Sequence, residues 1–218
     1  MHYLRILVIL LTLLSSLSAV AGDNSSLLKE KLQEIDRLME SAASRGLMAG
    51  SVVVIGDRTN ELFCRAYGRM SSASEARPIT VDSLFDIASL TKVVATAPVI
   101  LKLVEEGRIS LLDPVSRWFH EFADKGKNNL LILHLLTHTS GLDDFPLSQV
   151  NPLRSVLEGA AARKQVNRPG SHFKYADINF ILLGELVQRV TGVGLARYAA
   201  ENIFTPLQMK DTGFKPGV

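Results

Sequence analysis

Apolar residues lie three or four positions apart between Leu28 and Ala42, with charged residues between them. This spacing predicts an amphipathic helix that ends near Gly46. The stretch from Gly50 to Gly56 is dense in valine and isoleucine, Glu61 to Arg69 alternates more loosely, and the four residues 57–60 join them. We therefore predict a helix followed by an antiparallel β-hairpin.

The rest of the chain is predicted to be mostly helical. Residues 70–82 are rich in Ser, Ala and Pro, which predicts a loop, and helical apolar spacing then runs from Ser89 to Glu106. Pro98 lies inside this stretch and should kink it or mark a break, because proline cannot donate the helical hydrogen bond. Further apolar stretches predict helices over residues 130–137, 153–164, 179–190 and 195–204.

The number of predicted strands is small for a stable sheet. A lone two-stranded hairpin is marginal in water and needs further strands or a helical cover. The sequence shows one clear hairpin before a long helical stretch. Either the helices cover the hairpin completely, or the sheet requires strands that this chain does not contain.

The composition of the 218-residue chain is that of an ordinary globular protein, with 47% hydrophobic and 21% charged residues, which excludes intrinsic disorder. The 24 basic residues nearly balance the 22 acidic ones, and the net charge of +2 is too small to suggest nucleic acid as a partner. The single cysteine, Cys64, excludes an internal disulfide and a cysteine-rich zinc site.

The first 21 residues have the layout of a secretory signal peptide. Arg5 supplies a positive charge, a run that is apolar apart from Thr12 extends from Ile6 to Leu14, and Ala19-Val20-Ala21 offers small residues for cleavage. The alternative is an uncleaved membrane anchor, but the apolar run is shorter than the ~20 residues that cross a bilayer. We predict cleavage after Ala21 and a periplasmic or secreted domain over residues 22–218, with no stable membrane span.

Three Ser-x-x-Lys patterns occur, starting at Ser26, Ser89 and Ser171, and only Ser89 stands between an apolar segment and a long predicted helix. At i and i+3 on a helix, Ser89 and Lys92 share one face, and a helix N-terminus favours developing negative charge on the serine. A buried lysine loses its proton more easily and could accept the serine proton, which makes an activated nucleophile. The alternative is a plain N-cap serine.

Two further segments carry candidate chemistry. Tyr175 and Asp177 precede a predicted helix, and a phenol near an amine can relay protons, although a helix-start tyrosine with an Asp N-cap explains the same residues. His134 and His138 lie at i and i+4 and could hold zinc, but Leu135 stands where the zincin pattern needs a glutamate. We expect structural histidines and predict neither a metal nor a cofactor.

Four phrases occur in a characteristic order: FDIASLTK at 85–92, HLLTHTSGL at 134–142, PGSHFKYAD at 169–177 and PLQMKDTGF at 206–214. Together they resemble the serine β-lactamase and penicillin-recognising family, in the branch of class C β-lactamases, D,D-carboxypeptidases and β-lactamase-like esterases. The order and spacing match from about residue 26 to the end of the chain.

The resemblance implies an α+β fold of the β-lactamase/transpeptidase type, with a helical domain beside a helix-flanked antiparallel sheet. It implies that Ser89 is the acyl-accepting nucleophile and that its backbone N–H is one oxyanion donor. Lys92 would take or shuttle the serine proton, Tyr175 would be the partner base and acid, and the helices at 134 and 179 would be scaffold. The expected function is an exported serine hydrolase that acts on an ester, a β-lactam or a peptidoglycan-type D-Ala peptide.

The chain departs from the family pattern in two places. Asp177, the predicted substrate-binding residue, stands where the tyrosine motif usually closes with asparagine; ionised aspartate cannot donate to a substrate amide, and some esterase-like relatives resemble this variant. No Lys-Thr-Gly or His-x-Gly strand follows, so we expect the C-terminal strands, with the second oxyanion donor, to be missing. The alternatives to an active enzyme are a catalytically inactive truncated fragment and a non-catalytic envelope or binding protein. The sequence does not predict the oligomeric state.

Overall fold

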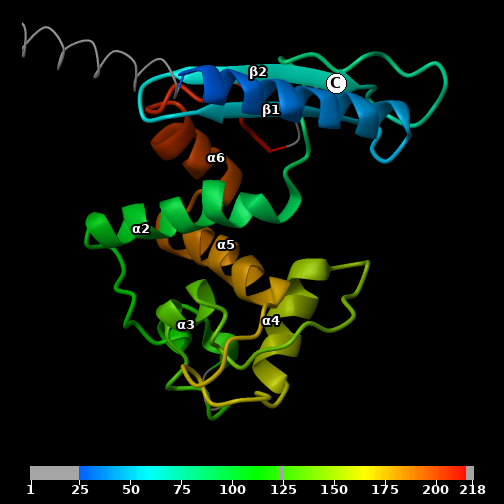
Figure 1. The fold of residues 1–218 in the computed structure, drawn as a ribbon. Coiled ribbons are helices and arrows are strands. Elements are labelled where there is room, and N and C mark those ends of the chain that lie inside the picture. The colour runs from blue at the N-terminus through cyan, green and yellow to red at the C-terminus, as the bar shows by residue number, and fades with distance from the viewer. Residues whose placement is uncertain (1–24, 123–124, 215–218) are drawn as a thin grey trace, which may run out of the picture. The chain divides into compact units, whose positions relative to one another are not determined.

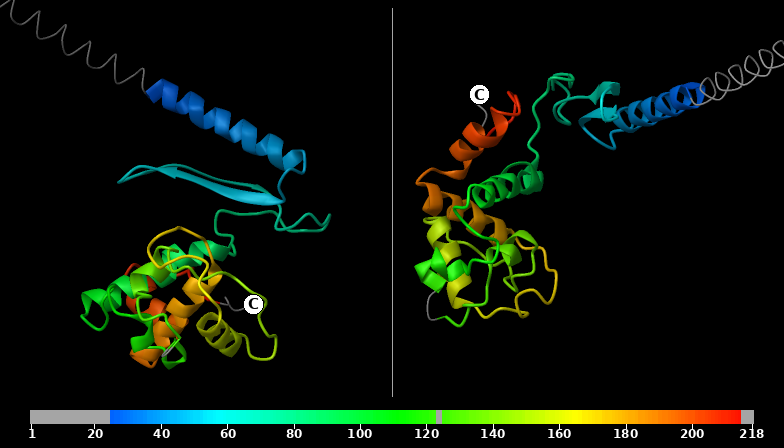
Figure 2. Two further views of the ribbon diagram at one scale, coloured as in Figure 1. Left: turned by 90° about the horizontal axis from the view of Figure 1, so that it is seen from below. Right: turned by 90° about the vertical axis from the view of Figure 1, so that its left-hand side faces the viewer.

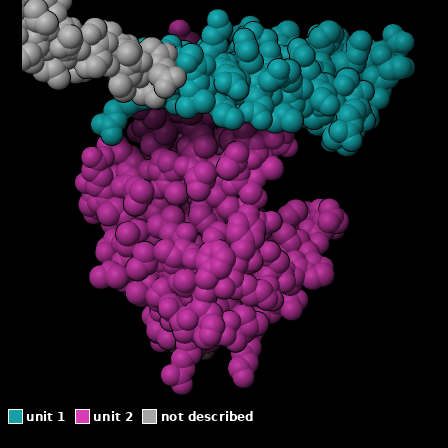
Figure 3. Space-filling view, viewed as in Figure 1, with its two compact units in different colours: residues 1–85 teal, residues 86–218 magenta. Residues whose placement is uncertain are grey.

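The computed structural model describes residues 25–122 and 125–214, so the predicted signal peptide lies outside the described residues. The chain divides into two compact units between Phe85 and Asp86 (Figure 3). All of the predicted catalytic residues belong to the second unit. Each unit is described below by itself.

The first unit is the predicted helix and hairpin (Figure 1). The helix covers residues 25–44, and the strands β1 (Gly50–Gly56) and β2 (Glu61–Gly68) pair antiparallel. The turn between them is held by Asp57, whose Oδ1 accepts hydrogen bonds from the backbone N–H of Thr59 and Asn60, both at 2.7 Å. These bonds lower the pKa of the Asp57 carboxyl group. The prediction of a helix and a hairpin is confirmed.

Asp36 joins the helix to the hairpin. Its carboxylate accepts a hydrogen bond from the Tyr67 hydroxyl at 2.6 Å and forms an ion pair with Arg65 at 2.5 Å. Burial, and then the bond to Asp36, raises the pKa of Tyr67 to about 12. The helix therefore packs beside the hairpin in both ribbon views (Figure 2). The sheet that the structure describes has two strands.

The second unit opens with the segment that carries Ser89. A 3₁₀ turn, η1 (Ala88–Leu90), leads into a π-helical stretch, η2 (Lys92–Thr96), and then into α2 (Ala97–Glu105). Pro98 lies in the first turn of α2, where the π-helical stretch changes to a regular α-helix. Because Pro98 has no N–H to donate to the preceding turn, the backbone widens before it and becomes regular after it. The predicted helical stretch from Ser89 is present, but it begins with a 3₁₀ turn and a π-helical stretch before it becomes α-helical.

Helix α5 (Asp177–Thr191) forms the centre of the second unit, and α2, α3 (Ile132–Leu136), α4 (Pro152–Ala162) and α6 (Leu195–Ala199) contact it (Figures 1 and 2). Three leucines of α5 are fully buried: Leu182, Leu183 and Leu186. The helix ends at Gly192, whose φ of 75° suits glycine. The short elements are η3 (Val115–Arg117), η4 (His120–Phe122) and η5 (Ala200–Phe204).

Within the described residues, no single helix has the length and apolar character needed to cross a membrane. One bent pair, Asp177–Thr191 with Leu195–Phe204, meets the criterion only on length and composition. Much of α5 is buried inside the helical unit, as expected of a core helix.

Candidate active site

Ser89 meets Lys92 and Tyr175 in the second unit. Its Oγ accepts a hydrogen bond from Lys92 Nζ at 3.0 Å and another from the Tyr175 hydroxyl at 2.8 Å. Tyr175 lies 86 positions further along the chain, immediately before α5. The fold therefore brings together three residue types that can form an activated nucleophile, at hydrogen-bonding distance. Ser89 and Tyr175 are exposed, as a group that meets a substrate must be.

The backbone before Ser89 is in an unusual conformation. Ala88 has a φ of 43°, in the left-handed region that residues other than glycine rarely adopt. Asp86 supports it, because its Oδ1 accepts a hydrogen bond from the Ala88 N–H at 2.8 Å. Strained backbone of this kind is held only where its surroundings fix it, and it fixes in turn the direction in which Ser89 points.

Lys92 is held as a cation by Asp177. The side chain of Lys92 is only 15% exposed, and its Nζ lies 2.8 Å from Asp177 Oδ1. Burial alone would lower the pKa of Lys92, but hydrogen bonds to Asp177 and Tyr175 outweigh it and raise that pKa. The same bond to Lys92 lowers the pKa of Asp177. The expectation that burial would help Lys92 to lose its proton is therefore wrong.

Asp177 is free to pair with Lys92 because another residue caps its helix. It is the first residue of α5, and the N-cap position belongs to Ala176. The carboxylate of Asp144 accepts the N–H of Asp177 at its Oδ2 and the N–H of Ile178 at its Oδ1, each at 3.0 Å. A carboxylate in this position also matches the positive end of the helix dipole. The alternative interpretation of Asp177 as an N-cap is wrong, and sequence reasoning did not single out Asp144.

The two histidines have separate structural partners. His134 Nδ1 accepts a hydrogen bond from the Leu131 N–H at 3.2 Å at the start of α3. His138 lies beyond the end of α3, and its ring stacks on that of Tyr175 with centroids 4.6 Å apart. In the part of the chain that the structure describes, no group of three or more His, Cys, Asp or Glu side chains could hold a metal ion. His138, expected to be scaffold, thus contacts the candidate site directly.

Comparisons with known proteins show the family of the chain. The family model described as Beta-lactamase matches residues 34–218. The chain belongs to the beta-lactamase family. The family resemblance inferred from the four sequence phrases is thereby confirmed.

Among curated proteins, this beta-lactamase family chain is 32% identical over 211 residues to a protein of Escherichia coli O157:H7 named as a D-alanyl-D-alanine carboxypeptidase. The match covers 86% of this chain and 48% of that protein. The chain thus spans about half the length of the curated relatives it matches.

Solved structures confirm the predicted fold class. A class C beta-lactamase in complex with cefoxitin matches with a TM-score of 0.73 and 23% identity, covering 84% of this chain and 51% of that one. EstCE1, a hydrolase with promiscuous acyltransferase activity, matches with a TM-score of 0.72 and 24% identity, covering 84% and 53%. At these identities the likeness shows the fold.

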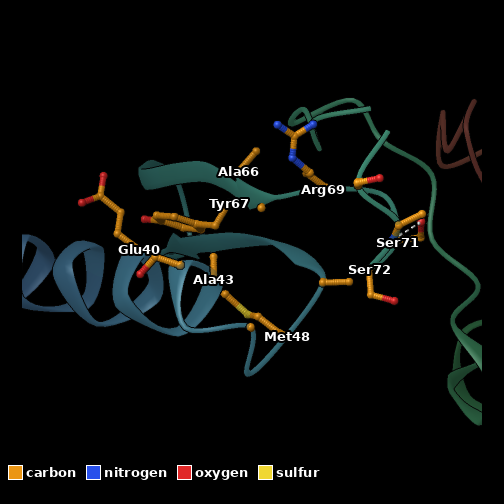
Figure 4. A pocket seen from close by; sticks show the side chains of 14 residues that line it. Glu40, Ala43, Met48, Ala66, Tyr67, Arg69, Ser71 and Ser72 are labelled. Carbon is orange, nitrogen blue, oxygen red and sulfur yellow. Dashed lines mark hydrogen bonds between the residues drawn. The ribbon is translucent and has the colours of Figure 1, made fainter. Parts of the chain in front are cut away.

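One hollow of this family member is lined by residues other than those around Ser89. A hollow of about 620 Å³ lies in the first unit, between the N-terminal helix and β2 (Figure 4). Glu40, Tyr67, Arg69 and the serines at 71 and 72 line it, and Tyr67 already donates to Asp36. Among these described lining residues, no serine lies beside a lysine or a histidine. This hollow therefore lacks the residues of an activated serine, and the chemistry points to Ser89.

Proposed function

We propose that this beta-lactamase family protein is a serine hydrolase that works through an acyl-enzyme on Ser89. One observation carries the proposal: Ser89 Oγ is hydrogen-bonded by both Lys92 and Tyr175. A serine hydroxyl is a weak nucleophile until a neighbouring base takes its proton. The arrangement supplies a candidate base and a fixed positive charge at the same oxygen.

The geometry favours the Tyr175 oxygen as the proton acceptor. Asp177 and Tyr175 raise the pKa of Lys92 and keep it as an ammonium group, which cannot accept a proton. The Lys92 Nζ lies 5.1 Å from the centre of the Tyr175 ring, so a fixed positive charge stands close to the phenol. Tyr175 is thus proposed as the base and Lys92 as its electrostatic support.

The proposed reaction has two steps. With Tyr175 in its phenolate form, Ser89 Oγ attacks the substrate carbonyl carbon and its proton moves to the phenolate oxygen. The carbonyl oxygen becomes an oxyanion facing the Ser89 N–H. When this intermediate collapses, the bond to the leaving group breaks and the leaving group takes the proton from Tyr175. Water then attacks the acyl group by the reverse sequence of proton transfers and frees Ser89.

The proposed substrates are esters, with β-lactams and D-Ala peptides as the other members of the class. Two relatives support this range: one is named as a carboxypeptidase and another is titled a hydrolase with acyltransferase activity. The carboxylate of Asp177 cannot donate to a substrate amide, and its partner in the structure is Lys92, which favours esters. The signal-like first 21 residues support export to the periplasm or the medium.

Covalent labelling tests the proposal. The purified chain is incubated with a fluorophosphonate, and intact mass and peptide mapping locate the adduct. We expect one adduct, on Ser89, and its loss in Ser89→Ala. Ser171→Ala is the matched control, because Ser171 has the same Ser-x-x-Lys spacing but its hydroxyl donates to the Arg168 carbonyl oxygen. Lys92→Ala should slow labelling at least ~10²-fold.

Turnover of p-nitrophenyl esters and nitrocefin then separates the substrate classes. Ester turnover that disappears in Ser89→Ala supports an esterase, and nitrocefin turnover supports a β-lactamase. A chain in which Ser89 takes no label would contradict the enzymatic proposal and favour a non-catalytic protein with this fold.

A further inference from the structure

His138 contacts the three residues 174–176 that carry Tyr175. Its carbonyl oxygen accepts a hydrogen bond from the Lys174 N–H at 2.8 Å, and its Nδ1 accepts one from the Ala176 N–H at 3.3 Å. Its ring stacks on the Tyr175 ring between these two bonds, with an interplanar angle of 29°. Backbone on both sides of Tyr175, and the phenol ring itself, are therefore fixed by one residue.

The surroundings of His138 leave its ring little freedom. The residue is 8% exposed, and the rings of Phe173 and Phe180 lie against it, at centroid distances of 5.9 and 5.1 Å. Its φ of 53° places it in the left-handed region, where histidine is one of the few non-glycine residues found repeatedly. A ring held in this way can hold Tyr175 in place.

Two buried polar residues fix the proton on the His138 ring. Ser140 Oγ donates to Asn179 Oδ1 at 2.6 Å, which directs the Asn179 amide nitrogen toward His138 Nδ1 at 3.2 Å. Nδ1 thus faces two donors, the Asn179 amide and the Ala176 N–H. It must be an unprotonated acceptor, so the neutral ring carries its proton on Nε2.

We propose that His138, in its neutral form, is a positioning residue that holds the Tyr175 hydroxyl against Ser89. This inference rests on the proposed function of the site. It assigns to the Thr-His-Thr-Ser-Gly phrase at 137–141 a direct task in presenting the base, through His138 and the Ser140–Asn179 pair behind it.

The contacts make this positioning sensitive to pH. Protonated His138 would place an Nδ1–H against two other donors, so the hydrogen bond from the Ala176 N–H to Nδ1 would be lost. The charged groups that act on the ring are Lys92 from η2, Asp177 from α5 and Asp144 from the loop after α3. Burial, followed by the Lys92 cation, lowers the pKa of His138 and keeps the ring neutral near pH 7.

A double-mutant cycle on the labelling rate of the full chain tests the positioning role. His138→Phe keeps an aromatic ring but removes the Nδ1 acceptor, and we expect ~10- to 10²-fold slower labelling of Ser89. Because His138 acts through Tyr175, the double variant His138→Phe/Tyr175→Phe should label no more slowly than Tyr175→Phe alone. His134→Phe, which removes a histidine that caps α3, is the control and should label at the wild-type rate.

A measurement on the wild-type chain covers the case in which the variant does not fold, since Phe adopts a positive φ poorly. In NMR spectra, the Tyr175 ring signals should shift with the same midpoint as the His138 ring, and the labelling rate should fall as pH drops through that midpoint. Two results would overturn the positioning role while Ser89 is still labelled. One is a labelling rate of the double variant that falls by the product of the two single losses. The other is a set of Tyr175 ring signals that do not shift as His138 is protonated. Absence of any label on wild-type Ser89 would instead overturn the proposed function, and the positioning role with it.

Discussion

Replacing Asp177 with asparagine should lower the pKa of Lys92. The carboxylate Oδ1 lies 2.8 Å from the Lys92 Nζ, and two unit charges at that distance attract by about 1.5 kcal/mol in surroundings that resemble water. Asp177 is 59% exposed, and solvent-exposed ion pairs are measured at ~0.2–1 kcal/mol. We therefore expect a loss of ~0.2–1 kcal/mol of charge stabilisation, which would be seen as a fall in the pKa of Lys92.

The assay follows the lysine directly. NMR titration of the Lys92 side-chain methylene signals gives its pKa in the wild-type chain and in Asp177→Asn. Labelling of Ser89 at each pH gives the chemical consequence. Removing the negative charge favours the deprotonated forms of Lys92 and Tyr175, which are the forms that can accept the serine proton. The rate profile should therefore move to lower pH, with labelling up to ~5-fold faster at pH 7.

Asp143→Asn is the control for this experiment. Asp143 also forms an ion pair with a lysine, Lys174, at 2.5 Å, but it does not contact Ser89 or Lys92. We expect the variant to leave the pKa of Lys92 unchanged. If Asp177→Asn also leaves it unchanged, the ion pair does not set the charge of Lys92 and the reasoning behind the site is refuted.

Three further outcomes follow from the packing of the second unit. The Arg189 guanidinium donates two hydrogen bonds to Glu121 and also pairs with Glu185, and each of these glutamates is 15% exposed. In urea unfolding, Arg189→Met should lose ~2–4 kcal/mol of stability, because both carboxylates lose their partner. Arg189→Lys should lose less, and equal losses would argue against the paired hydrogen bonds to Glu121. Leu183→Ala should cost ~2–5 kcal/mol because Leu183 is fully buried, whereas Leu101→Ala on the exposed face of α2 should cost little, and similar values for both would contradict the packing. The pKa of both His134 and His138 lies below the ordinary 6.5 in the folded chain. As pH falls below ~6.5 the unfolded chain therefore binds protons first, and the free energy of unfolding should decrease by about 1.4 kcal/mol for each unit by which the pKa is lowered. A urea midpoint at pH 5 equal to that at pH 7 would exclude this contribution.

Periodicity was enough to predict most of the elements. The hairpin and the helices that became α3, α4 and α5 follow from apolar spacing and from turn residues, because these signals are local. The helix predicted over residues 89–106 divides into a 3₁₀ turn, a π stretch and α2. Pro98 indicated a break, but the form of the backbone before it depends on packing that the spacing of apolar residues does not contain.

For the candidate site, the sequence was enough to choose the residues but not to predict their charges and contacts. Ser89, Lys92 and Tyr175 could be chosen from their motifs, and the fold brings their polar atoms together. The charge on Lys92 could not be predicted, because it depends on where Asp177 points, and that depends on Asp144, 33 residues earlier, taking over the cap of α5. His138 belongs to one of the four sequence phrases, but no neighbouring residue in the sequence indicated that its ring would contact Tyr175.

The φ of 43° at Ala88 has a consequence for how this chain can change. Glycine adopts that conformation freely, whereas a residue with a Cβ is destabilised there by roughly 1 kcal/mol. Ala88→Gly would relieve the strain, but it would also free the backbone next to Ser89. A substitution at position 88 that raises stability is therefore expected to lower the reactivity of Ser89. Selection for thermal stability alone would favour changes at the residue whose backbone orients the nucleophile.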